Sequence, residues 1–474
     1  MKTDLLAVFF TKRRTSLIEK LAKSNSPEKL LLYSFLFIIF LGSVLLTLPF
    51  ANIRTPAAYV DNLFVSVSAV CVTGLTTVTV AEQYSLFGKI ILIFLMEIGG
   101  LGPMTIIAII MQRNKRRMAT VEKKLFAATS GKSNLYDVPS YLRKIFLYTV
   151  VLELIGFILF SLRLCEHFGF EEGLFNSLFL SVSAFTNAGF DCFAADSLVQ
   201  FAADPLICLT VMALIITGGL GFIVWFELYD LIRFRFRQRQ GLHKKHRYLS
   251  EHAYVVLNTT AVLLVSGAIL FAILESGKTG TINQMDGPER VLVSMFQSVT
   301  LRTAGFSTVN IGSCTRPMLL IMCVYMLIGG SPGGTAGGIK TTTAAVLFKT
   351  AFNSLNQKHR DALIRYRKIS SSIMKQAFMI VTLYFAIIFA MTLVLTVSEP
   401  SATLLSLLFE VFSAIGTVGI STGITPVLSI TGKIVIMLLM FIGRMGPLSL
   451  YTAFHKEQKF RNHVEYPDAN LIIG

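Results

Sequence analysis

The chain is poor in charged residues, which make up 15% of its 474 positions, whereas soluble domains carry about 25%. Its six cysteines are scattered and form no C-x-x-C pair, so the sequence indicates neither a metal site nor a disulfide framework. Seven histidines are present without an H-E-x-x-H motif, and no nucleophile stands in a hydrolase-like arrangement. These absences argue against a soluble domain, a zinc protein and a membrane enzyme.

A phosphate-binding loop is also missing, although one segment resembles it. Residues 329–341 read GGSPGGTAGGIKT, and Gly333 and Gly338 have the spacing of the G-x-x-x-x-G-K-[ST] motif. However, Ile339 stands where that motif needs lysine, and Lys340 follows one place late. The preceding residues have the pattern of a long apolar helix, whereas a phosphate-binding loop follows a strand. The glycines therefore serve another purpose.

What the chain does have is long apolar runs, and 53% of its residues are hydrophobic. A helix needs about 20 mostly apolar residues to cross a bilayer, so the sequence predicts an all-α polytopic membrane protein. Residues 1–29 are charged and at most amphipathic, and we expect no cleavable signal peptide. The eight predicted spans are Leu30–Phe50, Ile90–Met111, Ile145–Leu164, Ile207–Phe226, Tyr254–Leu274, Leu319–Gly330 with its continuation past the glycines, Ile373–Val397 and Lys433–Leu450.

The net charge of +16 is unevenly distributed along the chain. Most of the 43 Lys and Arg residues lie before Leu30, within 113–144, 233–247 and 349–375, or after Leu450. The loops between these stretches hold mainly acidic residues. Because basic loops stay in the cytoplasm, both termini are predicted to be cytoplasmic. Topology and anionic membrane lipids explain the basic loops without nucleic acid, and docking of a cytoplasmic partner is the alternative.

An internal repeat runs through the chain. Clusters of small residues read SVSAVCVTGLTT at 66–77, SVSAFTNAGFDC at 181–192, FQSVTLRTAGFST at 296–308 and VFSAIGTVGIST at 411–422. Each cluster lies between two long apolar helices, so the repeated unit is a helix, a re-entrant segment and a second helix. The cluster glycines, separated by 115, 116 and 114 residues, are Gly74, Gly189, Gly305 and Gly419.

The repeat divides the chain into segments. We expect cytoplasmic termini at 1–29 and 455–474, and cytoplasmic basic loops at 113–141, 231–250 and 349–372. The four repeats then occupy 30–112, 142–230, 251–348 and 373–454, and the glycine-rich loop 329–341 lies in the third. The second helices of the other repeats carry matching glycines, but only the third repeat expands the position into a loop. These counterparts are Gly99, Gly100, Gly218, Gly219 and Gly443.

Irregular backbone at membrane depth is tolerated only where it is buried in protein or lines a water-filled cavity. The four re-entrant segments must therefore converge, which predicts a pseudo-fourfold arrangement around one ion pore. Short apolar segments are expected to form pore helices, whose negative C-terminal ends favour a cation on the axis. These segments are Leu63–Val70, Leu174–Ala184, Val291–Val299 and Leu404–Ala414.

After each pore helix, inward backbone carbonyls can replace the hydration shell of a monovalent cation, and glycine permits the conformations that this needs. A divalent site usually recruits carboxylates instead. Asp191, just past the second loop, either attracts cations at the mouth or caps a turn. The predicted carbonyl ring consists of Val72, Thr73, Gly74, Asn187, Ala188, Gly189, Thr303, Ala304, Gly305, Thr417, Val418 and Gly419.

With these motifs assembled, the chain resembles the Trk/Ktr/HKT superfamily of cation transporters over about residues 30–455. The resemblance implies potassium uptake across a bacterial cell membrane, because serine at the first ring position accompanies sodium transport in one plant branch and this chain has Gly74. It implies potassium ion as the substrate, with sodium or mixed transport as the alternative, and no organic cofactor. A secondary transporter of another solute is a distant alternative, since its repeats are usually inverted and these share one orientation.

The resemblance also implies a gate below the ring. In the family, a glycine-rich loop in the third repeat contacts an arginine of the fourth, which is Arg444 here. A charge at membrane depth is usually functional, although Arg444 and Lys340 can alternatively extend to the cytoplasmic interface. The predicted gate residues are Gly329, Gly330, Gly333, Gly334, Gly337, Gly338, Lys340 and Arg444.

By the same resemblance, a cytoplasmic ring of nucleotide-binding RCK subunits controls transport, and the membrane subunit forms a homodimer. Candidate docking surfaces are 231–250, 349–375 and the tail after Leu450. We expect Arg302 to brace a loop of the ring or reach the outer surface, and Glu410 to anchor loop N–H groups. Three further acidic residues have no assigned role: Glu97, Glu153 and Glu227.

Overall fold

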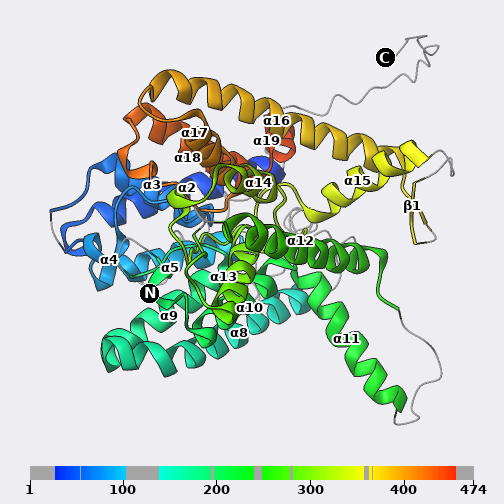
Figure 1. Ribbon diagram of the computed structural model, residues 1–474, viewed down its shortest axis with the longest axis horizontal. Coiled ribbons are helices and arrows are strands. Elements are labelled where there is room, and N and C mark those ends of the chain that lie inside the picture. Colours follow the sequence, from blue (N-terminus) through cyan, green and yellow to red (C-terminus); the bar gives the residue numbers. More distant parts are fainter. Residues whose placement is uncertain are drawn as a thin grey trace, which may run out of the picture.

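The computed structural model describes residues 27–53, 55–102, 138–193, 197–239, 248–277, 281–356, 362–365 and 367–454. Helices dominate this part of the chain (Figure 1). Its strands are β1 (Leu363–Ile364) and β2 (Arg367–Lys368), which pair as one short antiparallel hairpin. The all-α prediction is confirmed.

The same order of elements occurs four times along the chain. Each repeat has a long first helix, a shorter re-entrant helix and a second helix that is interrupted or ends near its middle. The first two repeats contain α2 (Pro27–Thr47), η1 (Pro49–Ala51), α3 (Tyr59–Val70), α4 (Val80–Gln83) and α5 (Leu86–Leu101), then α8 (Val138–Phe168), α9 (Phe170–Thr186), η2 (Val199–Phe201), α10 (Pro205–Gly219) and α11 (Phe222–Arg239). The last two contain α12 (Glu251–Glu275), α13 (Gly287–Thr300), η3 (Ile311–Ser313), α14 (Arg316–Leu327) and α15 (Thr341–Asn356), then α16 (Ser371–Ser398), α17 (Leu404–Gly416), η4 (Thr425–Val427), α18 (Ile430–Met445) and α19 (Pro447–Phe454).

Apolar side chains cover the outside of the long helices. Along α16, Phe378, Phe385 and Phe389 are exposed, while Tyr384 and Ile388 are buried against neighbouring helices. A surface of this kind is too extensive for a soluble monomer and suits contact with lipid. The helices α8, α12 and α16 are each long and apolar enough to cross a membrane.

The second helices differ from the prediction of uninterrupted spans. The span expected at 207–226 is bent by 100° between α10 and α11, and the span at 433–450 is bent by 89° between α18 and α19. The bends coincide with Gly221 and Gly446, whose φ angles of 84° and 80° leave the helical region. In the first repeat α5 ends before Gly102, which has a φ of 83°. The third repeat is therefore the extreme case of a break that recurs in the other repeats.

Small residues bring the first helix close to the re-entrant helix in three of the four repeats. In the first three repeats a serine hydroxyl on the re-entrant helix donates to a carbonyl oxygen of the first helix, at 2.6 to 2.8 Å. A glycine on the first helix faces each serine, and a Cβ there would collide with the hydroxyl. The serine, acceptor and glycine sets are Ser66, Ile39 and Gly42; Ser181, Glu153 and Gly156; Ser298, Leu264 and Gly267.

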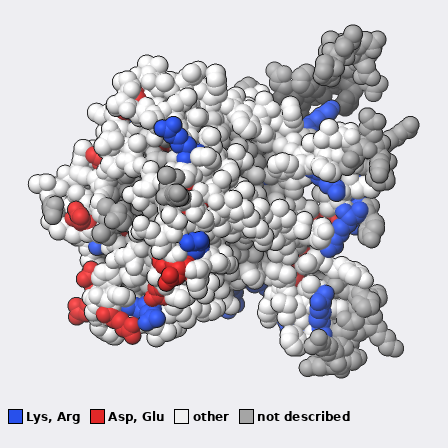
Figure 2. Space-filling view, viewed as in Figure 1, with Lys and Arg blue, Asp and Glu red and all other residues white. Residues whose placement is uncertain are grey.

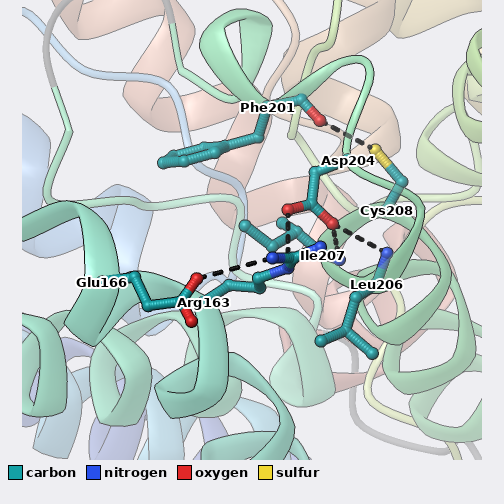
Figure 3. A network of polar contacts seen from close by, with 7 residues as sticks. All are labelled: Arg163, Glu166, Phe201, Asp204, Leu206, Ile207 and Cys208. Atoms are coloured by element: carbon teal, nitrogen blue, oxygen red, sulfur yellow. Dashed lines mark hydrogen bonds and ion pairs between the residues drawn. The ribbon is translucent and has the colours of Figure 1, made fainter.

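Carboxylates hold the ends of the helices opposite the breaks. Figure 3 shows Arg163 of α8 reaching Asp204, with 3.3 Å between Nε and Oδ2. Asp204 in turn accepts hydrogen bonds from the backbone N–H groups of Leu206 and Ile207 in the first turn of α10, at 2.8 and 3.2 Å. This arrangement caps α10 and ties it to the first helix of its repeat.

In the third and fourth repeats, a glutamate at the end of the first helix plays a related role. Glu275, the last residue of α12, accepts from the backbone N–H of Thr315 at 2.8 Å, just before α14. Glu399, directly after α16, accepts from the backbone N–H of Ser429 at 2.9 Å, just before α18. In each of these repeats, the end of the first helix thus fixes the start of the second helix.

Candidate functional site

Four loops, one after each re-entrant helix, have the same unusual backbone. Their glycines all have positive φ angles, which are 97°, 71°, 86° and 93° for Gly74, Gly189, Gly305 and Gly419. The residue two places before each glycine is also left-handed, although none of these four is a glycine, and such conformations are costly for ordinary side chains. These residues, with φ from 52° to 66°, are Val72, Asn187, Thr303 and Thr417.

The four glycines meet one another in sequence order. A Cβ built on Gly74 would lie 3.0 Å from the Cα of Gly189, and one built on Gly189 would lie 2.8 Å from the Cα of Gly305. A Cβ on Gly305 would lie 2.8 Å from the carbonyl oxygen of Val418, and one on Gly419 would lie 3.0 Å from the Cα of Gly74. The loops therefore close into a ring, here called the glycine ring, which admits no side chain at these positions.

The carbonyl oxygens of the glycine ring differ from its backbone N–H groups in the partners that the described residues offer. The backbone N–H groups of Thr73, Ala188, Ala304 and Val418 bond back to the re-entrant helices, at 2.8 to 3.0 Å. By contrast, no described residue donates a hydrogen bond to any carbonyl oxygen of the three ring residues in each repeat. Buried carbonyl groups are almost always paired in proteins, so a set of carbonyl oxygens without a described hydrogen-bond donor is unusual.

Hydroxyl groups on the re-entrant helices support the ring, and the sequence interpretation did not assign them. Ser68 and Ser413 accept from the backbone N–H groups of Gly74 and Gly419, at 3.0 and 3.1 Å. Ser183 accepts from Phe190 at 2.9 Å in the same manner. The signal was present in the clusters as a serine six places before three of the glycines.

A cavity of about 600 Å³ opens on one side of the glycine ring. Its lining includes the residues that follow each ring glycine, together with Glu82 and Asp191, and contains no Lys or Arg among the described residues. Asp191 also accepts a hydrogen bond from the backbone N–H of Phe193 at 3.1 Å, so it both caps a turn and faces the cavity. Burial raises the pKa of Asp191 to about 6.

Glu410, a buried residue of α17, anchors the fourth loop as the sequence predicts. Its carboxylate accepts from the hydroxyl of Ser421, from the backbone N–H of Thr422 at 3.3 Å and from the hydroxyl of Thr425 at 3.0 Å. These contacts fix the loop that lines the cavity beside Gly419.

The glycine-rich loop lies on the other side of the ring, between α14 and α15. Its two ends are joined by a hydrogen bond of 2.9 Å from the N–H of Gly329 to Ile339 and by one of 3.1 Å from Ile339 to Leu327. Its middle docks on the break in the second repeat, where Ser331 and Thr335 donate to the carbonyls of Gly219 and Gly218 at 3.0 and 3.2 Å. Those carbonyls are available because α10 ends there.

Glycine is required where the loop touches its neighbours. A Cβ on Gly337 would collide with the side chain of Thr417, and one on Gly334 would lie 3.0 Å from the carbonyl oxygen of Gly218. Gly333 and Gly338 have positive φ angles of 76° and 64°. The contact with Thr417 places the loop against the residues that precede the ring glycines.

Arg444 joins three repeats at this point. One guanidinium nitrogen donates to the carbonyl oxygen of Thr335 in the glycine-rich loop. The other donates to Gly99, and to Gly100 at 3.1 Å, in the last turn of α5. The side chain thus binds carbonyls inside the protein instead of extending to the interface. Lys340 likewise donates to Ala336 of its own loop at 2.7 Å.

Arg302 reaches the glycine-rich loop and not the outer surface. It is buried and donates to the carbonyl oxygen of Gly329 at 3.2 Å. Because Arg302 lies three residues before Gly305, it connects a loop of the ring with the start of the glycine-rich loop. Glu227 has a local role: its carboxylate accepts from the backbone N–H and the hydroxyl of Ser250, before α12.

Comparison with known proteins agrees with this architecture. Residues 23–464 match the TrkH family model, described as cation transport protein. The chain belongs to the TrkH family. It is 34% identical to the Ktr system potassium uptake protein B of Bacillus subtilis (strain 168), with 95% of this chain and 97% of the relative covered. It is 36% identical to the protein of the same name from Vibrio alginolyticus, with 96% of each chain covered.

Two further members of the family extend the comparison. The potassium/sodium uptake protein NtpJ of Enterococcus hirae is 34% identical, with 97% of this chain and 100% of the relative covered. The crystal structure of the potassium transporter TrkH from Vibrio parahaemolyticus aligns with a TM-score of 0.68 at 16% identity, covering 89% of this chain and 84% of that one. The fold and the family are therefore those of multi-pass membrane cation transporters.

Charge is divided between two ends of the molecule. In Figure 2 most red Asp and Glu atoms gather on the left, while the right end, over α11, α15 and the β hairpin, shows mainly blue Lys and Arg atoms. Much of the predicted cytoplasmic surface, including 113–137, 240–247, 357–361 and 455–474, lies outside the described residues, as does the end of the predicted span Ile90–Met111. Arg233 and Arg235 of α11 and Arg367 of β2 are described members of the basic end.

Proposed function

We propose that the protein takes up potassium ions by passing them through the glycine ring. The observation that carries this proposal is the set of unpartnered carbonyl oxygens around the four touching glycines. Such oxygens can replace the water of a monovalent cation as it enters, and they hold it weakly enough for it to leave. The acidic cavity before the ring, with Asp191 and Glu82, supports a cation as the substrate.

Potassium is favoured over sodium as the preferred ion. Each repeat supplies a glycine to the ring, and Gly74 stands where serine accompanies sodium transport in one plant branch of the superfamily. Two of the relatives are named for potassium uptake and one for both potassium and sodium. Sodium or mixed transport is the second candidate because of that last relative.

We infer that the glycine-rich loop and Arg444 close the pathway below the ring. The loop packs against Thr417, and Arg444 fixes it to the last turn of α5. Two cationic side chains, Arg444 and Lys340, bind carbonyl groups of the glycine-rich loop and have no described acidic partner. Their positive charges therefore also oppose a passing cation. Opening requires Arg444 to release the loop carbonyl of Thr335.

We propose that a cytoplasmic nucleotide-binding RCK ring controls this gate, with the membrane subunit working as a homodimer. The word "system" in the names of two relatives supports a separate subunit. The basic end formed by α11, α15 and the β hairpin is the docking surface, and α15 follows the glycine-rich loop directly. A partner that pulls on α15 therefore acts on the gate without entering the membrane. We also propose that both termini are cytoplasmic, which the positive-inside rule supports for a basic end of this kind.

Growth rescue tests the proposal. An uptake-deficient bacterial strain expressing this chain, with and without a co-expressed cytoplasmic RCK subunit, is grown over a series of potassium concentrations. We expect growth at low potassium, improved by the subunit. No rescue in either case, with the protein present in the membrane, contradicts potassium uptake, and equal rescue in both contradicts control by the partner.

A further inference from the structure

A small cavity lies inside the protein where the second and third repeats meet. It has a volume of about 10 Å³ and lies between α10, α12 and the end of α13, which packs against both of the other helices (Figure 1). The side chains that line it are apolar, except those of Thr260 and Arg302. A volume of this size is that of a single water molecule.

The two polar side chains of the cavity have unused hydrogen-bonding groups. Thr260 Oγ1 and Arg302 Nε are both buried and have no hydrogen-bond partner among the described residues. Only 6% of Thr260 and 7% of Arg302 is exposed, so bulk solvent does not satisfy these groups. Because buried polar groups are almost always paired, two such groups at one cavity indicate that the cavity holds a ligand.

The hydroxyl of Thr260 lacks the partner that is usual inside a helix. Serine and threonine in helices often donate to a carbonyl oxygen one turn earlier. Ser266, further along α12, does so with the carbonyl oxygen of Val262 at 2.6 Å, whereas Thr260 has no such bond. The hydroxyl of Thr260 is therefore available to the cavity.

The guanidinium of Arg302 carries a charge that no described carboxylate pairs with. Its Nη2 donates to the carbonyl oxygen of Gly329 at 3.2 Å, which leaves Nε without a described partner. Three residues before the ring glycine, the other repeats have Cys71, Thr186 and Gly416. The arginine thus occurs in the one repeat that has the glycine-rich loop, and its buried charge needs further hydrogen bonds.

The cavity adjoins two attachments of the glycine-rich loop. One is the hydrogen bond from Arg302 to Gly329, where the loop begins. The other is the hydrogen bond of 3.0 Å from the backbone N–H of Ser331 to the carbonyl oxygen of Gly219, a residue that also lines the cavity. A ligand in the cavity therefore supports the loop from the side of α12.

We propose that Thr260 and Arg302 bind one water molecule that fixes the glycine-rich loop in its closed position, an inference that rests on the proposed function of that loop. The water accepts from the Nε–H group of Arg302 and forms a second hydrogen bond with the hydroxyl of Thr260, and two partners suffice for a buried water. Thr260 is then a positioning residue, which acts on the gate through the water and Arg302.

Water fits this cavity better than an ion does. The positive guanidinium repels a metal cation, and a chloride ion is larger than the single water molecule for which the volume of about 10 Å³ has room. The apolar residues around the two polar groups, among them Ile215, Leu220 and Val299, offer no further side-chain ligand for an ion.

Rubidium-tracer flux into liposomes that contain the full chain without a partner tests the proposal. Thr260→Val keeps nearly the same volume but removes the hydroxyl, and it should raise basal flux about fivefold, a typical size for coupling between sites. Thr260→Ser retains a hydroxyl and should restore flux to near that of the parent. Thr259→Val, at the next position of α12 but outside the cavity lining, is the matched control and should leave flux unchanged.

A double-mutant cycle, measured by thermal unfolding in detergent, tests whether Thr260 acts through Arg302. Thr260→Val should lower the unfolding temperature of the parent but cause no further loss in Arg302→Met, because the water has then already lost its other partner. An equal loss in both backgrounds overturns the proposal, since Thr260 then contributes independently of Arg302.

The flux outcomes separate this inference from the proposed function. Equal rubidium flux in the parent, Thr260→Val and Thr259→Val overturns the water bridge while leaving potassium transport intact. Flux that changes when gluconate replaces chloride, and loses this dependence in Thr260→Val, also overturns it, because the cavity then binds an anion. Absence of rubidium flux in the parent and in every variant, with correct reconstitution, contradicts the proposed function itself.

Discussion

Arg444 of α18 donates to the carbonyl oxygen of Thr335, which lies 109 residues earlier in the glycine-rich loop. The same guanidinium donates to the carbonyl oxygen of Gly100 in the first repeat at 3.1 Å. A single side chain thereby links the first, third and fourth repeats directly below the glycine ring. Because a guanidinium offers several donors in a fixed plane, lysine cannot reproduce this arrangement.

Replacing Arg444 with alanine should increase basal potassium flux in the absence of a partner. The loop loses its link to α5, and a positive charge leaves the pathway, so we expect a rise of about fivefold or more. Tracer flux in liposomes measures the effect, and Arg163→Ala, which alters an ion pair at the opposite end of the helices, is the control. Unaltered basal flux in Arg444→Ala contradicts the gate.

Gly74→Ser should weaken the preference for potassium over sodium. The added Cβ lies 2.7 Å from the carbonyl oxygen of Ala188. The serine must also adopt the backbone φ of 97° that Gly74 has. Such strain costs about 1–2 kcal/mol and displaces the neighbouring carbonyls, so we expect roughly a tenfold loss of selectivity. Gly277→Ser, where no atom lies within 4 Å of the new Cβ, is the matched control. An equal potassium-to-sodium ratio in both variants and the parent argues against the ring as the selective site.

External acid should reduce uptake through Asp191. Because burial raises its pKa to about 6, the side chain is charged at neutral pH and becomes neutral as external pH falls through 6. Loss of this negative charge lowers the local cation concentration in the outer cavity. With the inside held at constant pH, the parent should lose uptake between pH 7 and 5 by about twofold or more, whereas Asp191→Asn should stay low and level over this range. If uptake fell equally between pH 7 and 5 in the parent and in Asp191→Asn, Asp191 would be excluded as the titrating group.

The ion pair between Lys433 and Asp61 should stabilise the closed arrangement of repeats. Its atoms are 2.6 Å apart and its side chains are largely buried, and it joins α18 of the fourth repeat to α3 of the first. Lys433→Met leaves a partly buried carboxylate unpaired, which should cost about 1–3 kcal/mol of stability. Thermal unfolding in detergent measures the change. The exposed pair of Arg367 and Glu251 is the control, and Arg367→Met should cost less than about 1 kcal/mol. Equal losses of stability in Lys433→Met and Arg367→Met would contradict the role of the buried pair.

The repeat explains why so much of this fold was predictable. Four clusters at a nearly constant interval located all four re-entrant helices and the glycines after them, and Gly74 and Gly419 do lie against each other. The bends at Gly221 and Gly446 were not predicted, because the apolar pattern continues through both positions. A glycine inside such a run is consistent with either a straight or a broken helix.

Other features of the site depend on contacts that sequence does not encode locally. The left-handed conformation of Val72 opposes the intrinsic preference of a β-branched residue and arises only because the ring imposes it. The partner of Arg302, Gly329, lies 27 residues away in the glycine-rich loop. Tertiary packing decides each of these.

The most direct test of the account is the ion selectivity of flux through the purified protein. Potassium and sodium tracer uptake into liposomes is compared for the parent chain and for Gly74→Ser, with Gly277→Ser as the control. The account predicts downhill potassium flux that exceeds sodium flux in the parent and the control, with the difference reduced in Gly74→Ser. Equal permeation of both ions in all three proteins, or saturable exchange of another solute without cation flux, would contradict it.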